Sequence, residues 1–396
     1  MNILYVSSLC SEPMMHELFD TAQEKPHPAP QKYHSLLVKG LFANGHNVTC
    51  LVAPPVTLRS HPQKKWWTQK AENVDGVRYV YMPFYNHPIP KLLGFRIYAF
   101  FYTLGWILRT RGEKVMICDV LNAHAFASMR ACLLTRTKAA GIITDIPGMM
   151  VGLRKDSMIR RWSIRRNNNN IKSLTHFIPL TEAMNDIYNP ERKKPFVVVE
   201  GLVDSEMKVM KPTPYQDGRR HITYTGALNA RYGVKTLVEA FMCLPQEDIV
   251  LDVYGKGPMD AEMPEYAKKD ARIHYHGMVP VEESVKAQRS SYLLVNPRPT
   301  KEEFTKYSFP SKNMEYMATG VPLLTAKLPG MPLDYYPNVF LFEDESVEGL
   351  RKRLDEILVM HETEVKAKGQ QGKNFVMDNK NNIRQAERVM EMLSGE

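Results

Sequence analysis

The sequence has few cysteines and no pattern that would join them. Its five cysteines are widely spaced along 396 residues, and no two of them form a Cys-x-x-Cys pair. An odd number at such spacing argues against a disulfide framework and provides no zinc site. We therefore expect reduced, mostly buried thiols at Cys10, Cys50, Cys118, Cys132 and Cys243.

The sequence also lacks a long uncharged apolar run. The nearest candidate, residues 92–108, contains Arg96 and is too short for a membrane span. It either lies at a lipid surface or forms a buried core helix. Residues 1–9 have no basic leader and are typical of a buried first strand, so we expect a cytoplasmic protein.

The sequence has fewer acidic than basic residues, with 43 Asp and Glu and 52 Lys and Arg, so its formal net charge is +9. This balance predicts an anionic partner, which is nucleic acid, a phospholipid surface or a phosphorylated small molecule. Residues 160–166 hold four arginines around Trp162, and Trp66 and Trp67 follow two lysines. Such stretches suit lipid headgroups or single-stranded nucleic acid. Because no nucleic-acid-binding motif is recognisable, we predict a peripheral position on an anionic membrane surface and no nucleic acid.

Two domains are expected, because 396 residues exceed what one core usually supports. β-like runs alternate with helical patterns, which predicts doubly wound parallel sheets of the α/β class. The predicted organisation is a first domain 1–188, a polar linker 189–200, a second domain 201–376 and a C-terminal helix 377–396. The predicted strands are 3–6, 48–53, 77–81, 115–117, 140–144 and 177–180, then 222–225, 249–254, 273–276, 292–296, 322–325 and 339–342.

Residues 307–322, YSFPSKNMEYMATGVP, indicate a helix that begins at an anion site and leads into a buried strand. Pro310 and Ser311 supply the stop and the cap, and Lys312 and Glu315 share one face. The unpaired N–H groups and the dipole of such a helix start attract an anion, and a lysine in the first turn needs one. The alternative is an ordinary amphipathic helix with an exposed Lys–Glu pair.

The run that starts at Glu315, EYMATGVPLL, resembles the nucleotide-sugar motif of the GT-B glycosyltransferases of family 4. The resemblance covers most of residues 200–396 and, more thinly, the first half. It implies two Rossmann-like domains facing a central cleft, with the last helix crossing back to the first domain. It also implies a donor of the UDP-sugar or GDP-sugar type, transfer with retention of configuration, no resident cofactor and no consistently placed nucleophile.

Sugar transfer from such a donor requires that the departing diphosphate be stabilised. No Asp-x-Asp metal site occurs in the sequence, so we predict a metal-independent enzyme that holds the diphosphate with cations and helix starts. The candidates are Lys312 and Arg231, with Arg298 as a third. The alternative for Arg298 is a surface arginine without a role.

The loop GALNARYG, residues 226–233, resembles the family's diphosphate clamp and implicates Gly226. It departs from the family at Ala227 and Tyr232, where the family has Arg and Lys. The start of the 311–319 segment adds Ser311 to the predicted donor contacts.

Glu315 matches the second Glu of the family's Glu-x7-Glu pattern, which implies a bond to the donor's ribose, whereas the first falls at Tyr307. We expect Glu303 to approach the sugar instead; the alternative is that Glu302 and Glu303 form a solvated acidic loop. Three further donor contacts are predicted. They are Met278 and Val279, whose backbone the resemblance implies reads the nucleobase, unless this is a simple strand-end turn, and Gly330, which permits close backbone approach.

In the first half, residues 119–124, DVLNAH, resemble a family strand end. The resemblance implies that His124 points into the cleft and bonds hydroxyls of the donor sugar; the alternative is a structural histidine. Asp145 follows another predicted strand and is a candidate for holding the acceptor. The predicted catalytic residues are therefore His124, Asp145 and Glu303, with no metal ligands.

Together these features predict a retaining glycosyltransferase that acts on a lipid-linked cell-surface glycan precursor at the cytoplasmic face of the membrane. One alternative is a soluble transferase that acts on a small molecule or protein. Another is a GT-B-shaped binding subunit without activity, suggested by Ala227, Tyr232 and Tyr307 at three expected polar positions.

Overall fold

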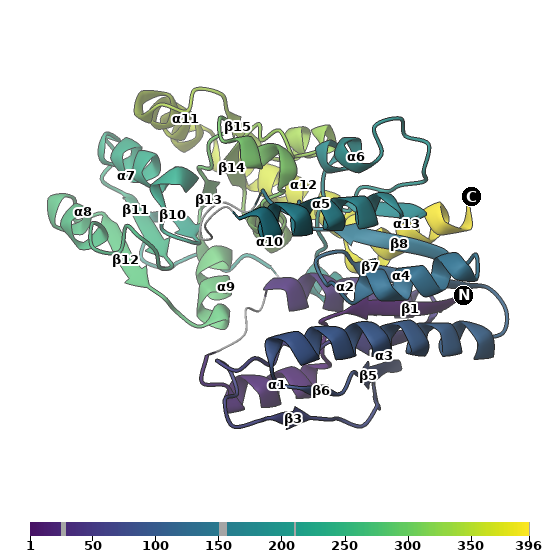
Figure 1. Ribbon diagram of the computed structural model, residues 1–396. Coiled ribbons are helices and arrows are strands. Elements are labelled where there is room, and N and C mark those ends of the chain that lie inside the picture. The colour runs from purple at the N-terminus through teal and green to yellow at the C-terminus, as the bar shows by residue number, and fades with distance from the viewer. Residues whose placement is uncertain (25–28, 150–156, 210, 396) are drawn as a thin grey trace. The chain divides into compact units, whose positions relative to one another are not determined.

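The computed structural model describes residues 1–24, 29–149, 157–209 and 211–395, and the chain forms two compact units (Figure 1). Unit 1 contains Met1–Leu202 and Asn382–Glu396, and unit 2 contains Val203–Asn381. Unit 1 therefore takes its last helix from the end of the chain. Each unit is built around one predominantly parallel sheet.

The sheet of unit 1 has the order β4-β5-β2-β1-β7-β8-β9, and every pair except β4–β5 is parallel. Its central strands are almost wholly buried, as expected when helices cover both faces. The chain runs outward from β1 and then returns to its other side at β7, and such switch points bind ligands at the carboxyl ends of the strands. The strands are β1 (Asn2–Ser7), β2 (Asn47–Val52), β4 (Glu72–Val74), β5 (Val77–Tyr81), β7 (Lys114–Asp119), β8 (Lys138–Ile143) and β9 (His176–Pro179).

The helices of unit 1 are α1 (Glu12–Thr21), α2 (Ala29–Ala43), α3 (Pro88–Arg109), α4 (Ala125–Leu134), α5 (Met158–Lys172), α6 (Glu182–Tyr188) and α13 (Asn382–Ser394). α13 packs closely on α2, because a Cβ at Gly40 would lie only 2.0 Å from the carbonyl oxygen of Asn382. Lys138 at the start of β8 donates to the carbonyl of Leu393 at 2.6 Å. Both ends of α13 are thus fixed to unit 1.

The sheet of unit 2 has the order β12-β11-β10-β13-β14-β15, and all its pairs are parallel. Its switch point lies between β10 and β13, the two strands where the chain reverses its direction across the sheet. The strands are β10 (Arg220–Thr225), β11 (Ile249–Tyr254), β12 (Ile273–Gly277), β13 (Leu293–Asn296), β14 (Leu323–Ala326) and β15 (Phe340–Phe342).

Helices cover both faces of this sheet. In Figure 1, α7, α8 and α11 lie on one side of the strands and α9 and α10 on the other. α7 buries Val234, Leu237, Val238 and Phe241, the apolar face that its sequence period predicts. The helices are α7 (Val234–Met242), α8 (Met263–Lys269), α9 (Val281–Ser290), α10 (Ser311–Thr319), α11 (Val347–Val359) and α12 (Glu362–Asn379), with short 3-10 turns η2 (Ala230–Tyr232) and η3 (Glu303–Tyr307).

Every strand predicted from the sequence is present, with ends displaced by no more than two residues. Three further strands were not predicted, β4 and the antiparallel pair β3 (Trp66–Trp67) and β6 (Phe84–Tyr85), because they are too short to show a period of apolar residues. The expectation of mostly buried thiols is confirmed, since only Cys243 is exposed. None of the described helices combines the length and hydropathy needed to cross a bilayer.

Candidate functional site

The switch point of unit 2 is held in place by side chains that connect β10 and β13 to α10. The hydroxyl of buried Tyr316 accepts from Thr225 N at 2.8 Å and lies 3.0 Å from the Thr225 carbonyl. Asn296, the last residue of β13, donates to Asn313 Oδ1 at 2.6 Å. These bonds fix the start of α10 against the carboxyl ends of both strands. The roles of these four residues were not predicted from the sequence, because they depend on contacts between distant segments.

The loops that follow β10 and β11 approach each other at three glycines. Gly255 has a φ of +129°, and a Cβ there would lie 1.8 Å from the carbonyl oxygen of Gly226. A Cβ at Gly257 would lie 2.4 Å from the carbonyl oxygen of Leu228. Only glycine permits this contact. Gly226, a predicted donor contact, therefore also sets the path of the loop that leads to Arg231.

Arg298, just after β13, is the most enclosed cation at this edge of the sheet. Its guanidinium lies 4.5 Å from the ring centroid of Phe304 and 5.6 Å from that of Tyr232. Nη2 donates to Ser308 Oγ at 3.1 Å, whereas the buried Nε has no partner among the described residues. Burial lowers the pKa of Arg298 from its ordinary value. Arg298 is therefore a partly desolvated cation that no described carboxylate neutralises.

Arg231 is exposed and forms an ion pair with Glu302 in the loop after β13. Its guanidinium also lies 5.7 Å from the ring of Phe304, the ring on which Arg298 stacks. The structure thus brings Arg231 and Arg298 to one aromatic side chain. Glu303, the predicted catalytic carboxylate, is exposed at the start of η3, and it is Glu302 that contacts the cation.

The start of α10 differs from the prediction in one respect. Ser311 is the first helical residue and not the cap; Pro310 occupies the cap position and no side chain caps the helix. Proline has no side-chain acceptor to offer, so the first-turn N–H groups receive none from the cap residue. Lys312 Nζ lies 3.2 Å from a carboxylate oxygen of Glu315, as the spacing predicts.

The remaining predicted donor contacts also lie in loops after strands. Exposed Met278 and half-buried Val279 follow Gly277 at the end of the edge strand β12. Gly330 is buried in the turn after β14, where Met331 N donates to the Leu328 carbonyl at 2.9 Å. One further cavity of unit 2 is lined by His221, Gly320 and Lys366 and is separate from these residues.

A chain of hydrogen bonds crosses the other half of the same sheet. Asp252 on β11 lies 2.5 Å from His221 Nδ1 on β10 and 2.6 Å from His276 Nε2 on β12, and His221 Nε2 lies 3.0 Å from Asp217. Burial raises the pKa of Asp252, but bonds from the two histidines outweigh it and hold the pKa below its ordinary value. Burial lowers the pKa of His221, but its two carboxylate partners raise the pKa overall.

Within the described ranges, one group of side chains has the proximity a metal ion needs: ligand atoms of Asp252, His274 and His276 all lie within 4.8 Å of one another. However, two ligands of a tetrahedral ion with bonds of about 2.0 Å are about 3.3 Å apart. The 2.6 Å between His276 and Asp252 is instead a hydrogen-bond length. Hydrogen bonding therefore accounts for this cluster.

We expect replacement of His221 by glutamine to destabilise the protein most between about pH 4 and 6. The bond from His221 lowers the pKa of Asp217 from its ordinary value of 3.8 to about 2. The stabilisation of the folded state by this bond is therefore fully present above pH 3.8 and is lost as the pH falls through about 2. The raised pKa of His221 gives stabilisation that is present below 6.5 and lost as the pH rises through the folded value. Melting curves of parent and variant across pH check this, and a difference that does not shrink toward alkaline pH contradicts it.

In unit 1, His124 lies at the cap position of α4, at the end of the short loop that follows β7. Its ring is buried, 5.8 Å from the ring centroid of Phe95, and its Nε2 has no partner among the described residues. Burial lowers the pKa of His124 to about 4, so the imidazole is neutral at pH 7. The group is available as a neutral hydrogen-bonding partner and not as a cation.

Asp145 follows β8 and is half-buried, and burial raises the pKa of its carboxyl group. Nearer the switch point lies a set of three buried polar side chains that was not predicted from the sequence. Tyr5 OH on β1 is 2.6 Å from His34 Nδ1, and His34 Nε2 is 3.4 Å from Asp119 at the end of β7. Only the close pairing of β1 and β7 makes this set visible, since the sequence places its members far apart.

Comparison with known proteins finds a family match in unit 2. Residues 219–359 match the family model described as glycosyl transferases group 1. Unit 2 is therefore similar to the domains of this family. The match lies within unit 2 and includes Arg231, Arg298, Lys312 and Glu315. No curated protein matches the sequence.

Solved structures of similar fold cover the whole length of the chain. HepE from Anabaena, solved in complex with UDP, shares 11% identity with a TM-score of 0.62, and both chains are covered completely. Sucrose-phosphate synthase from Thermosynechococcus elongatus shares 13% with a TM-score of 0.63, again over 100% of both chains. The lipopolysaccharide outer core galactosyltransferase WaaB shares 14% with a TM-score of 0.60, over 100% of this chain and 99% of its own. This likeness confirms the predicted GT-B fold.

Proposed function

We propose that the protein is a retaining glycosyltransferase that transfers a sugar from a nucleoside-diphosphate donor to a lipid-linked precursor of a cell-surface glycan. The donor would lie at the carboxyl edge of the unit 2 sheet. The glycosyltransferase family of unit 2 and the UDP bound by the similarly folded HepE support a donor of this class.

Arg298 is the observation that carries the donor assignment. Its guanidinium is partly desolvated between Tyr232 and Phe304 and faces no described carboxylate. A diphosphate is the anion this arrangement favours, because charge-assisted bonds strengthen where water is excluded. The uncapped start of α10 adds backbone donors, and Lys312 adds a second cation. In this assignment Arg298 replaces the clamp positions at which Ala227 and Tyr232 depart from the family.

The acceptor assignment rests on unit 1 and on analogy. α5 exposes Trp162 and Met158 beside arginines, and α3 exposes several large apolar side chains. Aromatic and basic side chains together suit the boundary between headgroups and acyl chains. The similarly folded WaaB is described as a lipopolysaccharide outer core galactosyltransferase, and we carry the class of membrane-borne acceptor over to this chain as part of the proposal.

Lys312→Ala is expected to weaken nucleoside diphosphate binding about tenfold or more, because one charge-assisted contact contributes about 1.5–3 kcal/mol. Calorimetric titration with UDP and GDP on parent and variant measures the change. Lys306→Ala is a matched control, since Lys306 is an exposed lysine of the preceding η3 turn. Equal affinities in parent and Lys312→Ala would remove Lys312 from the site. Failure of the parent to bind any nucleoside diphosphate would overturn the proposed function.

Consumption of a nucleotide-sugar donor distinguishes an active transferase from a binding subunit that has lost activity. Tyr232, one of the three departures from the family, packs against Arg298 and so takes part in the proposed site. We therefore expect slow hydrolysis of a UDP-sugar or GDP-sugar by the parent and its loss in Arg298→Ala. A parent that binds a nucleoside diphosphate but never consumes a sugar donor would be a binding subunit.

A further inference from the structure

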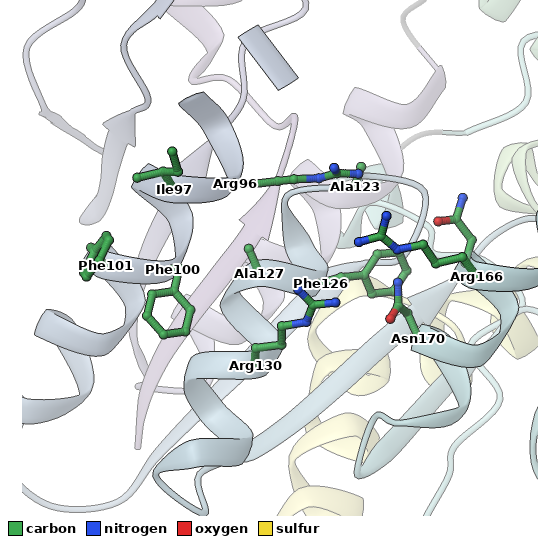
Figure 2. Close-up of a pocket in the computed structure, with 11 residues that line it drawn as sticks. Arg96, Ile97, Phe100, Phe101, Ala123, Phe126, Ala127, Arg130, Arg166 and Asn170 are labelled. Carbon is green, nitrogen blue, oxygen red and sulfur yellow. The ribbon is translucent and has the colours of Figure 1, made fainter. Parts of the chain in front are cut away.

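Unit 1 contains a pocket between α3, α4 and α5 that the donor site does not use (Figure 2). Its volume is about 280 Å³, which suits a headgroup and is too small for a whole nucleotide sugar. Three arginines contribute to it, one from each helix: Arg96, Arg130 and Arg166. Figure 2 shows their guanidinium groups directed toward a common space beside Ala127 and Phe126.

The charge of the pocket has one sign. Among the described residues, no Asp or Glu lines it, and none of the three arginines forms an ion pair or hydrogen bond with another residue. Burial lowers the pKa of Arg96, and repulsion by Arg166 and Arg130 lowers it further. Like charges held together raise one another's free energy, and an anion between them removes that cost. The pocket is therefore complementary to a multiply charged anion such as a diphosphate.

The apolar part of the lining distinguishes this pocket from a site for a free anion. Ile97, Phe100 and Phe101 form one wall. Ile97 and Phe101 also continue a stripe along α3 that includes Ile89 and Leu93, four residues apart at each step and each more than half exposed. Twelve residues of helix span about 18 Å, so the stripe offers a hydrocarbon chain an extended apolar track. The opposite face of α3 is buried through Phe95, Ala99, Thr103 and Ile107.

The pocket lies next to His124, one of the predicted catalytic residues. Ala123 precedes His124, and Phe126 and Ala127 follow it, at the carboxyl end of β7 beside the switch point. We propose that this pocket binds the diphosphate group of a lipid-linked acceptor and that the stripe on α3 receives its hydrocarbon chain. This inference rests on the proposed function and names the site at which that acceptor is held. In this proposal Arg166 contacts the diphosphate, whereas the other arginines of residues 160–166 do not line the pocket.

Vesicle binding with matched arginine variants tests the headgroup contact. The pocket variant is Arg96→Gln/Arg130→Gln/Arg166→Gln, and the control is Arg59→Gln/Arg109→Gln/Arg111→Gln, which removes the same charge from exposed positions of unit 1. Phosphatidylcholine vesicles that contain a small fraction of a polyisoprenyl diphosphate should bind the pocket variant about tenfold or more weakly than the parent. The control should bind as the parent does, apart from the common effect of lost charge that phosphatidylglycerol vesicles measure. Equal losses in the two variants overturn the proposal.

A second measurement distinguishes a lipid-borne diphosphate from a free one. The parent should bind farnesyl diphosphate more tightly than inorganic diphosphate, because burial of the isoprenoid chain adds to the ionic contact. Ile97→Ser/Phe101→Ser should remove that preference and leave the affinity for inorganic diphosphate unchanged. Both residues are exposed, so the fold should persist, and an unchanged melting temperature checks it. Equal binding of both probes by the parent would mean a free-anion site and would overturn the proposal.

UDP binding and lipid diphosphate binding test the proposed function and the proposed pocket independently. UDP titration of the pocket variant should give the parent's affinity, since the contacts proposed for the donor's diphosphate all lie in unit 2. UDP binding without selective binding of polyisoprenyl diphosphate overturns the pocket assignment and leaves the donor chemistry intact. Binding of the lipid diphosphate by a parent that neither binds nor consumes a nucleotide sugar supports the pocket and overturns the proposed function.

Discussion

Replacing Gly255 by alanine is expected to destabilise unit 2 by about 3–5 kcal/mol, the sum of a strained positive φ and a backbone clash. The new Cβ would lie 1.8 Å from the carbonyl oxygen of Gly226, at a φ of +129° that side chains rarely adopt. That carbonyl belongs to the loop leading to Arg231, so relaxing the clash displaces the loop. The melting temperature should fall by about 10 °C or more, and UDP affinity should fall with it.

Two other glycines separate the causes of this effect. Gly218 has a φ of +73° with no atom within 4 Å of its would-be Cβ, so Gly218→Ala carries backbone strain without the clash. Gly257 shows no such φ but would meet the Leu228 carbonyl oxygen at 2.4 Å, so Gly257→Ala carries the clash without the strain. We expect each to lower the melting temperature less than Gly255→Ala. If Gly255→Ala and Gly218→Ala have the same melting temperature, the close contact between the two loops does not contribute to stability.

Arg298→Ala is expected to reduce nucleoside diphosphate affinity by about a hundredfold, the equivalent of roughly 2.7 kcal/mol. The effect should exceed that of Lys312→Ala for two physical reasons. The guanidinium of Arg298 is enclosed by Tyr232 and Phe304, which weakens its screening by water, whereas Lys312 is balanced by Glu315 at 3.2 Å. Arg298 forms no ion pair among the described residues, so its removal should lower the free energy of unfolding only a little.

The charge-conserving variant sharpens this test. Arg298→Lys keeps the cation but loses the planar stacking on Phe304 and the forked donors, so its affinity should lie between parent and Arg298→Ala. Lys352→Ala, an exposed residue of α11, is the control for lost charge in unit 2. Calorimetry at constant ionic strength provides the comparison. If Arg298→Ala binds UDP and GDP as tightly as the Lys352→Ala control, the diphosphate lies elsewhere and Arg298 is a structural side chain.

The sequence predicted the elements of the site better than their connections. The Lys312–Glu315 pair was expected from helical spacing and is present, because spacing along one helix fixes which side chains are neighbours. Ser311 was wrongly expected to cap that helix, since the proline before it takes the cap position. The stacking of Arg298 could not be expected, because Tyr232 and Phe304 come from loops after different strands. Arg298 on its own reads as a surface arginine.

The run 92–108 shows the same limit in unit 1. Of its two interpretations, the buried core helix is confirmed for one face of α3, whereas the other face is apolar and exposed and its place at a lipid surface stays a prediction. Periodicity alone did not separate the faces, because large apolar residues occupy both. Packing against α4 determines which face is buried, and the exposed Ile97 and Phe101 then join arginines from two other helices.

By itself the sequence determined the class of fold, the strands and the resemblance of the second half to one family, because these depend on local patterns: apolar runs of strand length, helical periods between them, and one contiguous motif around Glu315. The tertiary structure alone decided the order of the strands and which charged groups meet. Parallel strands are joined only through distant crossovers. The meeting of the carboxyl ends of β10 and β13, the two glycine contacts and the cluster Arg96, Arg130 and Arg166 therefore form only when the chain folds. Local pattern selects each element, whereas long-range packing places its side chains.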